Sequence, residues 1–307
     1  MYLGRLWKIS FAFLFTTVCC ACDDNADDTD GDTSGDTGGD TNGNTNGDTG
    51  NEYEPVSCDG VLEFPDANLE AAVREAIGLS TGDIYSENVA GLTSLEAGSA
   101  IADLTGIECL TSLTELDLEE NDISDISPLS KLTGLNSLIL DSNSISDISP
   151  LSGLINLTHL DVEFNDISDV SPLSGLKNLI DLFLSSNSIR DVSPLSGLTN
   201  MNKLVLDENM ISDISSLSGL TTNLVLFYIS GNNIIDISPV SGMTLLQWLS
   251  VGANNITDIS PLVENQGIDS GDYVDIAENP FDCEDTTIQG YLAELKSRGV
   301  MLQSDCE

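Results

Sequence analysis

The side chains best suited to chemistry surround the single histidine of the chain. His159 stands two residues before Asp161 and 22 residues before Asp181. An imidazole close to two carboxylates could ligate a metal ion or act as a general base. One imidazole and two open carboxylates make a poor metal site, however, and no serine, cysteine or second histidine stands where it could complete a nucleophilic pair. The sequence therefore predicts a protein that is not an enzyme and that holds no metal or cofactor.

The charge of the chain is strongly one-sided. Its 307 residues include 51 aspartates and glutamates against 9 lysines and arginines, which gives a formal net charge of -42. Nucleic-acid binding is excluded, because phosphates are neutralised by clustered lysine and arginine. A hydrophobic fraction of 40% is nevertheless enough for a folded core. We expect an acidic, monomeric protein that attracts partners with basic patches.

The start of the chain has the features of an export signal. Two basic residues precede an apolar stretch over residues 9–18, which is too short to span a membrane. Ala21 and Cys22 end this segment, and two aspartates follow. This ending resembles the lipobox of bacterial lipoproteins, which implies that residues 1–21 are a signal peptide and that Cys22 carries the lipid anchor. The resemblance implies a place in the bacterial cell envelope, at the outer membrane or the cell surface. Cleavage near Ala21 with free secretion is the alternative.

Residues 22–55 consist almost entirely of Asp, Thr, Gly and Asn. Such a segment cannot offset its chain entropy by burying apolar surface, so it is predicted to be a disordered acidic tether. Asp28, Asp30 and Asp32 alternate as carboxylates do in calcium loops, but the closing bidentate glutamate and the flanking helices are missing. We favour a solvated spacer, with calcium binding as the alternative.

A 22-residue repeat occupies the centre of the chain. Its frame, L-x-x-L-x-L-x-x-N-x-I-x-D-I-S-P-L-x-x-L, is complete from Leu135 to Leu154 and recurs in about eight units over residues 108–281. The repeated asparagines are Asn121, Asn143, Asn165, Asn187, Asn209, Asn232, Asn254 and Asn279. The pattern resembles the leucine-rich repeat family, specifically the 22-residue bacterial subtype found in the internalins.

Each part of the frame predicts one structural element. The Leu-x-Leu alternation predicts a short strand with both leucines inward, and stacked coils place these strands in a parallel sheet. The asparagine is expected to hydrogen-bond the backbone of neighbouring coils as a ladder. Ser-Pro predicts the N-cap and first turn of a short 3₁₀ or helical segment. The expected fold is an α/β repeat solenoid, a curved leucine-rich repeat with a parallel β-sheet on the concave face and short 3₁₀ or helical turns on the convex face.

Both ends of a solenoid expose core residues and need caps. Residues 56–107 are predicted to form the N-terminal cap, with a helix that begins after Asp66 and a degenerate first coil. Residues 282–307 are predicted to form the C-terminal cap around an amphipathic helix over residues 286–298. The stack is therefore expected to carry one helix at each end.

Four cysteines lie outside the signal region, at Cys58, Cys109, Cys283 and Cys306. An even number in an exported chain predicts disulfides, and no close C-x-x-C pair favours a metal site instead. Three pairings are possible. The local pairing, Cys58 with Cys109 and Cys283 with Cys306, would place one bridge in each cap.

Seven aspartates recur four residues after the ladder asparagines. Turn caps that accept backbone N–H bonds are the favoured interpretation, and a row of cation ligands is the alternative. These residues are Asp125, Asp147, Asp169, Asp191, Asp213, Asp236 and Asp258.

The exposed strand positions are left for function, because structure occupies the other repeated positions. They are acidic in the N-terminal half of the concave face and apolar to aromatic in the C-terminal half. Exposed rings often anchor interfaces, although they could merely cover the sheet. We expect a surface that binds a protein or peptide ligand. The internalin resemblance implies adhesion. The alternative is a structural or polyanionic surface protein that associates with cations. The candidate ligand-binding residues are His159, Phe183, Lys203, Val205, Tyr228, Trp248 and Tyr273.

Overall fold

The computed structural model describes residues 57–98 and 100–306. The chain divides into two units, Met1–Tyr53 and Glu54–Glu307, and the described residues all belong to the second. The predicted signal peptide, the predicted lipid attachment at Cys22 and the predicted tether lie outside the described residues. Within residues 57–98 and 100–306, no helix has the length and apolar character needed to cross a membrane.

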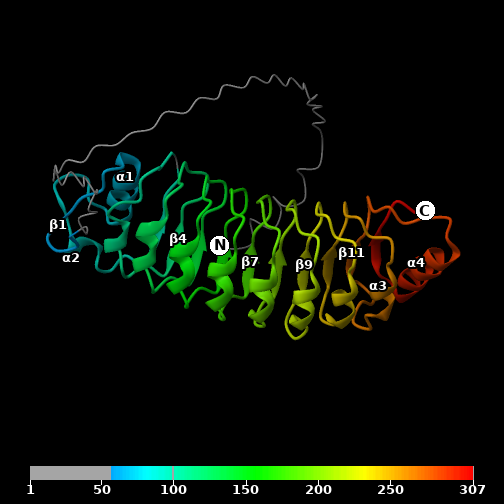
Figure 1. Cartoon of the computed structure of the whole chain (residues 1–307). Helices are drawn as coiled ribbons and strands as arrows, with labels where there is room; N and C mark the ends of the chain where they lie inside the picture. The colour runs from blue at the N-terminus through cyan, green and yellow to red at the C-terminus, as the bar shows by residue number, and fades with distance from the viewer. Residues whose placement is uncertain (1–56, 99, 307) are drawn as a thin grey trace, which may run out of the picture. The chain divides into compact units, whose positions relative to one another are not determined.

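A parallel sheet of ten strands forms one face of this unit (Figure 1). Its strands follow one another in chain order without a crossover, and each pairs in register with the next. Repeating coils of nearly equal length produce this order, because each coil returns its strand to the same side of the stack. The strands are β3 (Ser94–Glu96), β4 (Glu115–Asp117), β5 (Ser137–Ile139), β6 (His159–Asp161), β7 (Asp181–Phe183), β8 (Lys203–Val205), β9 (Leu226–Tyr228), β10 (Trp248–Ser250), β11 (Tyr273–Asp275) and β12 (Met301–Gln303).

Short helical turns run along the opposite side of the stack (Figure 1). All but the last are 3₁₀ turns, so the prediction of a leucine-rich repeat solenoid with short convex turns is confirmed. These turns are η1 (Ile107–Cys109), η2 (Ser127–Lys131), η3 (Ser149–Gly153), η4 (Ser171–Gly175), η5 (Ser193–Gly197), η6 (Ser215–Gly219), η7 (Ser238–Gly242) and the α-helix α3 (Ser260–Glu264).

The convex aspartates cap these turns. In η3, Asp147 Oδ1 accepts a hydrogen bond from the backbone N–H of Ser149 at 2.8 Å, and each of the other six aspartates accepts the equivalent bond. The prediction of turn caps is confirmed. The prediction that the serine is the N-cap was wrong, because Ser149 is the first residue inside the turn and Ile148 occupies the N-cap position without a side-chain bond. The aspartate two residues earlier supplies the bond instead.

The repeated asparagines form the predicted ladder. Asn165 Oδ1 accepts a bond from the backbone N–H of Ile145 in the preceding coil at 2.9 Å, and Nδ2 donates to the carbonyl of Leu140 in that coil at 3.0 Å. Nδ2 also donates to two carbonyls of its own coil. Asn121 and Asn279, at the two ends of the ladder, repeat this pattern. Each asparagine thus satisfies backbone groups that the bend after the strand would otherwise leave unpaired.

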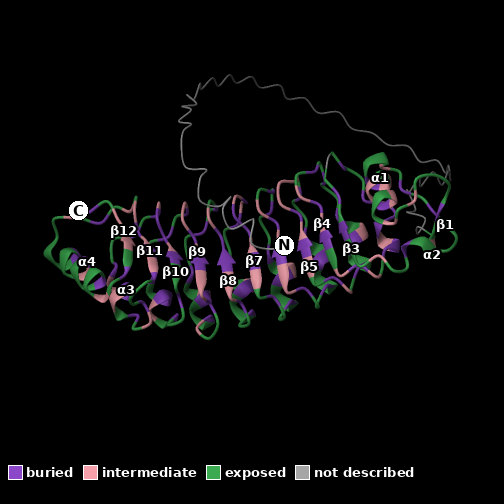
Figure 2. Ribbon diagram, turned by 180° about the vertical axis from the view of Figure 1, so that it is seen from behind, coloured by how far each residue is buried: buried purple, intermediate pink, exposed green. Residues whose placement is uncertain are grey.

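Leucine, isoleucine and valine side chains fill the interior as one continuous core. Leu138 and Leu140 of the Leu-x-Leu alternation are both fully buried, as predicted. Buried positions recur in every coil along the stack (Figure 2). The largest buried side chain, Phe227, takes a position that is leucine in the preceding coils.

Helix α1 (Ala67–Ala76) covers the N-terminal end together with β1 (Val61–Leu62), β2 (Ile84–Tyr85) and the short α2 (Ser86–Val89). Strands β1 and β2 form a separate antiparallel pair. Asp66 is the N-cap of α1, as predicted, and its second carboxylate oxygen accepts the backbone N–H of Ala102 at 2.9 Å. One aspartate therefore both starts the helix and joins it to the first coil.

Helix α4 (Thr286–Arg298) covers the C-terminal end. It begins at the N-cap Asp285 and ends at Gly299, whose φ of +87° favours glycine. Strand β12 follows at once and closes the sheet. A helix thus lies at each end of the stack.

The two disulfides have the local pairing. Cys58 is bonded to Cys109 in the N-terminal region, and Cys283 is bonded to Cys306 in the C-terminal region. Of the three pairings that the sequence allows, the structure has the one that places a bridge in each cap.

Candidate ligand-binding face

Three rows of side chains cross the concave face at right angles to the strands. The first row contains the first residue of each strand, the second row contains the third residue, and the third row lies two residues beyond the strand end. The middle residue of each repeat strand points into the core. From β4 onward, the first row is Glu115, Ser137, His159, Asp181, Lys203, Leu226, Trp248, Tyr273 and Met301.

The C-terminal end of the first row is an apolar strip, which we define as Leu226, Trp248, Tyr273 and Met301. These four residues are register neighbours on β9 to β12. Trp248 is 44% exposed, and its ring centroid lies 5.9 Å from that of Tyr273. Met301 is 50% exposed. The strip therefore presents exposed apolar surface across four consecutive strands.

Met301 was missing from the predicted ligand-binding residues. Strand β12 belongs to the C-terminal cap and precedes no ladder asparagine, so the repeat frame does not assign its residues to rows. The pairing of Tyr273 with Met301 extends the first row by one strand. In the sequence, the short apolar run of residues 300–302 after Gly299 was the only sign that another strand follows.

The second row places Phe183, Val205 and Tyr228 side by side on β7, β8 and β9. Phe183 and Tyr228 are partly exposed, whereas Val205 is only 5% exposed. The prediction of Val205 as a ligand-binding surface residue needs correction, because its short side chain lies between two larger rings. Burial raises the pKa of the Tyr228 hydroxyl to about 12, and Tyr273 and Asp207 add to the effect. Tyr228 therefore remains a neutral phenol.

His159, Asp181 and Lys203 form a small charged group in the middle of the first row. Lys203 Nζ lies 3.0 Å from Asp181 Oδ2, and His159 Nδ1 lies 3.8 Å from the same oxygen. Burial acts to raise the pKa of Asp181, but hydrogen bonds from His159 and Lys203 outweigh it and hold that pKa below its usual value. The His159 ring also lies 5.4 Å from the Phe183 ring. The histidine is thus engaged by one carboxylate and one aromatic ring.

The geometry around His159 bears on the two kinds of chemistry considered for it. In residues 57–98 and 100–306, no three histidine, cysteine, aspartate or glutamate side chains gather as a metal-binding group. Asp161, which the sequence places near His159, lies in the second row of the same strand, and its electrostatic neighbours are acidic residues. The structure therefore brings His159 together with Asp181 and Lys203.

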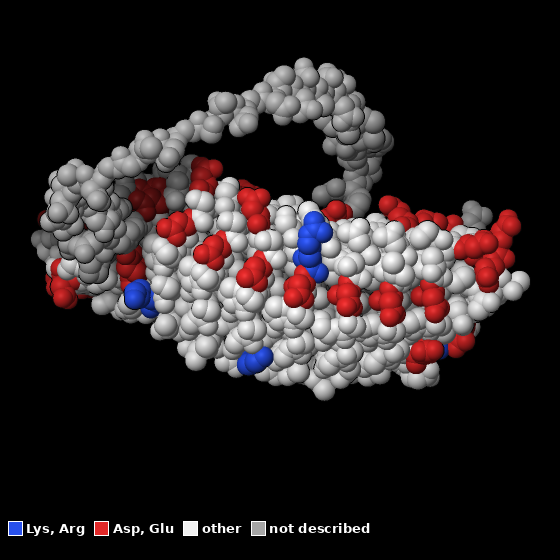
Figure 3. Space-filling view, in the orientation of Figure 1, with Lys and Arg blue, Asp and Glu red and all other residues white. Residues whose placement is uncertain are grey.

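The N-terminal end of the face is acidic. Burial raises the pKa of Asp161 to about 8, and the charges of Glu163, Asp141 and Glu119 raise it further. Burial also raises the pKa of Glu163. We call Asp117, Glu119, Asp141, Asp161 and Glu163 the acidic end. Acidic side chains far outnumber basic ones on the face seen in Figure 3. A cation brought to the acidic end would stabilise the ionised carboxylates.

A polar chain runs beside the apolar strip, in the second and third rows from the β8 coil to the β11 coil. Asp207 Oδ1 accepts the backbone N–H of Ser230 at 2.6 Å, the hydroxyls of Ser230 and Ser250 lie 2.6 Å apart, and Ser250 donates to Asp275 at 3.1 Å. Burial raises the pKa of Asp207 to about 7 despite the hydrogen bond from Ser230. The sequence contains these residues in the second and third rows but does not signal that they are connected.

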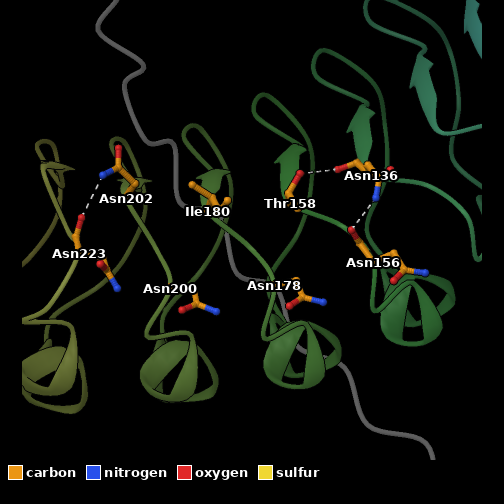
Figure 4. A pocket seen from close by; sticks show the side chains of 8 residues that line it. All are labelled: Asn136, Asn156, Thr158, Asn178, Ile180, Asn200, Asn202 and Asn223. Atoms are coloured by element: carbon orange, nitrogen blue, oxygen red, sulfur yellow. Dashed lines mark hydrogen bonds between the residues drawn. The ribbon is translucent and has the colours of Figure 1, made fainter.

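A groove on the flank of the stack was not predicted. It runs between the 3₁₀ turns and the strand starts, over coils β5 to β9, and has a volume of about 630 Å³ (Figure 4). We call it the asparagine groove. Its signal in the sequence is an asparagine nine residues before the ladder asparagine in four consecutive repeats. The lining residues are Asn136, Asn156, Thr158, Asn178, Ile180, Asn200, Asn202 and Asn223.

The repeats and the fold both have known counterparts. The family model for Leucine Rich repeats (2 copies) matches residues 111–153, 133–175, 155–196 and 177–219. The structure is similar to that of an internalin, InlF, of Listeria monocytogenes strain 4b F2365, with a TM-score of 0.69 and 33% identity over 78% of this chain and 68% of that chain. It is also similar to internalin C2 of the same strain, with a TM-score of 0.61 and 33% identity over 66% of this chain and 91% of that chain.

A curated relative matches over a shorter stretch. A segment of 63 residues is 46% identical to Internalin J of Listeria monocytogenes serotype 4b, strain F2365. This segment covers 20% of the present chain and 7% of Internalin J. The match therefore concerns a short segment and not the whole of that relative.

Proposed function

Because the chain belongs to the internalin-type leucine-rich repeat proteins, we propose that it is a non-catalytic binding protein whose concave face holds a protein or peptide ligand. The apolar strip is the observation that carries this proposal. Four consecutive strands of an acidic protein carry exposed Trp248 and Met301 and half-buried Leu226 and Tyr273 in one row. Aromatic residues of this kind supply much of the binding energy at protein interfaces.

The proposed ligand carries an apolar segment beside a basic one. The apolar segment would cover the strip on β9 to β12, and lysine or arginine side chains would reach the acidic end on β4 to β6 across β7 and β8. The net charge of -42 would speed the encounter with a basic partner at low salt. The strip would limit dissociation, because salt screens exposed charges but does not weaken buried apolar contacts.

Capture from cell-envelope extracts tests this proposal. Wild-type protein, the Trp248→Ala variant and the matched Leu245→Ala variant would be immobilised in parallel. Leu245 is a suitable control because it is also an exposed apolar residue, at 48%, but lies outside the three rows. We expect a partner that Trp248→Ala holds about 30-fold less tightly, since loss of an anchor residue costs about 2 kcal/mol.

The kinetics of the captured partner sharpen the test. Trp248→Ala should speed dissociation, whereas higher ionic strength should slow association and leave dissociation nearly constant. Capture that is the same for wild type and Trp248→Ala would contradict binding at the strip. It would favour instead a structural or polyanionic surface protein that acts through its charge.

The proposed protein is a monomer held in the bacterial cell envelope by a lipid on Cys22. The lipobox-like ending of the signal peptide supports this anchor, and the acidic tether of residues 22–55 would keep the repeats away from the membrane surface. The mature protein should enter the detergent phase in a phase-partition experiment, and Cys22→Ser should stay in the aqueous phase. Membrane association that survives Cys22→Ser would contradict the anchor.

A further inference from the structure

The asparagine groove differs chemically from the rest of the surface. Its eight lining residues are six asparagines, Thr158 and Ile180, and none is charged. It lies on a chain with a net charge of -42 and opens beside the strand starts (Figure 4). A groove of this size falls within the range of pockets that bind small molecules and short oligomers.

Each asparagine in the groove uses only part of its hydrogen-bonding capacity within the protein. Asn156, Asn178, Asn200 and Asn223 each donate from Nδ2 to a carbonyl of the preceding coil at 2.9 Å. Their side-chain oxygens accept no hydrogen bond from residues 57–98 and 100–306. One N–H and one carbonyl oxygen of the side-chain amide therefore stay available on Asn156, Asn178 and Asn200, whereas Asn223 Nδ2 also donates to Thr222 Oγ1 at 3.3 Å and keeps its carbonyl oxygen. The internal bonds hold each amide in place, so little rotamer freedom is lost when a ligand binds.

The free groups select a ligand that both donates and accepts at Asn156, Asn178 and Asn200 on three consecutive coils. Hydroxyl groups do this, because each carries one donor and two acceptor lone pairs. Anionic ligands are disfavoured by the charge of the protein, and cationic ligands would find no carboxylate in the lining. The groove thus matches an uncharged ligand rich in hydroxyls.

The spacing between neighbouring coils distinguishes a sugar chain from a peptide as the ligand of the groove. Neighbouring coils repeat roughly every 4.8 Å along the sheet, whereas an extended peptide presents donors on one edge only every 6.8 Å or so, at every second residue. A peptide would fall out of register with the row of the groove nearest the strands, where the sheet spacing applies. A pyranose chain carries hydroxyls along both edges of every unit and does not meet this mismatch.

Ile180 supplies the apolar contact that a sugar ring also needs. It lies between Thr158 and Asn202 in the row of the groove nearest the strands and is 44% exposed (Figure 4). The C–H face of a pyranose ring could lie on this side chain while its hydroxyls reach the amides. We propose that the asparagine groove binds an uncharged oligosaccharide that runs along the stack from the β5 coil to the β9 coil.

Titration of the full chain with defined oligosaccharides tests this inference. Maltohexaose, cellohexaose and N-acetylchitohexaose are neutral probes, and hexagalacturonate is an anionic control of similar length. Saturation-transfer NMR and calorimetry would measure binding. We expect at least one neutral probe to bind and the anionic one to fail. No binding of any neutral probe at millimolar concentration would overturn the proposal.

Two variants locate the site. Ile180→Asp changes an exposed residue and places a charge in the groove, and it should weaken the bound probe at least about tenfold. Asn178→Leu removes one amide and should do the same, with circular dichroism to confirm that the stack still folds. Trp248→Ala should leave sugar binding unchanged, so failure of this inference is distinguishable from failure of the concave-face proposal. Two further results would overturn the oligosaccharide proposal: sugar binding of unchanged affinity in Ile180→Asp, or a neutral serine-alanine hexapeptide that binds as tightly as the sugar.

Discussion

Replacing Asp161 by asparagine should stabilise the repeat stack, and the gain should be larger at pH 7 than at pH 5. The carboxyl is half-buried on the concave face beside Glu163, Asp141 and Glu119, and its pKa is raised from 3.8 to about 8. Between those two values the folded protein keeps a proton that the unfolded chain releases. The free energy of unfolding therefore falls as the pH rises through this window.

The magnitude follows from the size of the window. One pKa unit corresponds to about 1.4 kcal/mol, so Asp161 can lower the free energy of unfolding by up to about 3 kcal/mol between pH 5 and pH 7. Asparagine has nearly the same size and no proton to release, so the variant should lack this slope. The charge on Glu163 should also become easier to form once its neighbour is neutral.

Urea denaturation of wild type and Asp161→Asn at pH 5 and pH 7 measures the difference. The midpoints should separate further at pH 7, while the dependence on urea stays the same. Asp213→Asn is a matched control on the convex face, where bonds from the backbone and hydroxyl of Ser215 lower the pKa of the aspartate. That variant should be destabilised at both pH values, since it weakens a turn cap whose aspartate is ionised at both. Equal gains for Asp161→Asn at pH 5 and pH 7 would refute the assigned burial of its charge.

Three further predictions concern the ladder, the C-terminal cap and the charged group of the first row. Asn165→Leu should lower the free energy of unfolding by about 2 to 4 kcal/mol, because backbone groups in two coils lose their hydrogen-bond partner. Urea denaturation measures this loss. A loss below about 0.5 kcal/mol would contradict a stabilising role of the asparagine ladder. The double variant Cys283→Ser/Cys306→Ser should lose about 3 kcal/mol, the chain-entropy value for a 23-residue separation, and unchanged thermal unfolding would contradict it. Lys203→Met should raise the pKa of Asp181 in an NMR titration, since the lysine helps to hold it down; an unmoved pKa would mean that the ion pair is absent in solution.

The fold was predictable because each fixed position of the repeat frame has one structural role. The Leu-x-Leu alternation predicted the strands, the asparagine spacing predicted the ladder, and both cap helices begin after the aspartates that precede them in the sequence. The Ser-Pro step was the part of the frame assigned wrongly. Serine and aspartate both cap helices, so the sequence does not show which of the two accepts the first backbone N–H of the turn. The path of the backbone in three dimensions shows that Asp147 is the acceptor, for the N–H of Ser149.

The candidate site was less predictable, because exposure depends on neighbours in other coils. Val205 and Phe183 occupy the same row. Val205 is buried because the larger rings of Phe183 and Tyr228 lie on either side of it, whereas Phe183 itself is partly exposed. Met301 joins the apolar strip through a strand that lies outside the repeat frame. The asparagine groove was not predicted because Asn178 and its equivalents occupy a position that the repeat frame leaves variable.

Two members of the acidic end also bond within their own coil, because Asp117 and Asp161 accept the backbone N–H groups of Glu119 and Glu163 at 3.2 Å. Ionised carboxylates on adjacent coils would repel one another, by about 3 kcal/mol per pair at roughly 5 Å and an effective dielectric constant of about 20, and Asp161 avoids part of this cost by keeping its proton. Equivalent third-row positions further along the stack are Ser230 and Gly252, so the repeat does not require an acid there. Asp161 and Glu163 thus lower the stability of the free protein at neutral pH. A basic segment of a ligand would relieve this repulsion directly, and so the acidic end is the part of the concave face where a cationic side chain would gain the most.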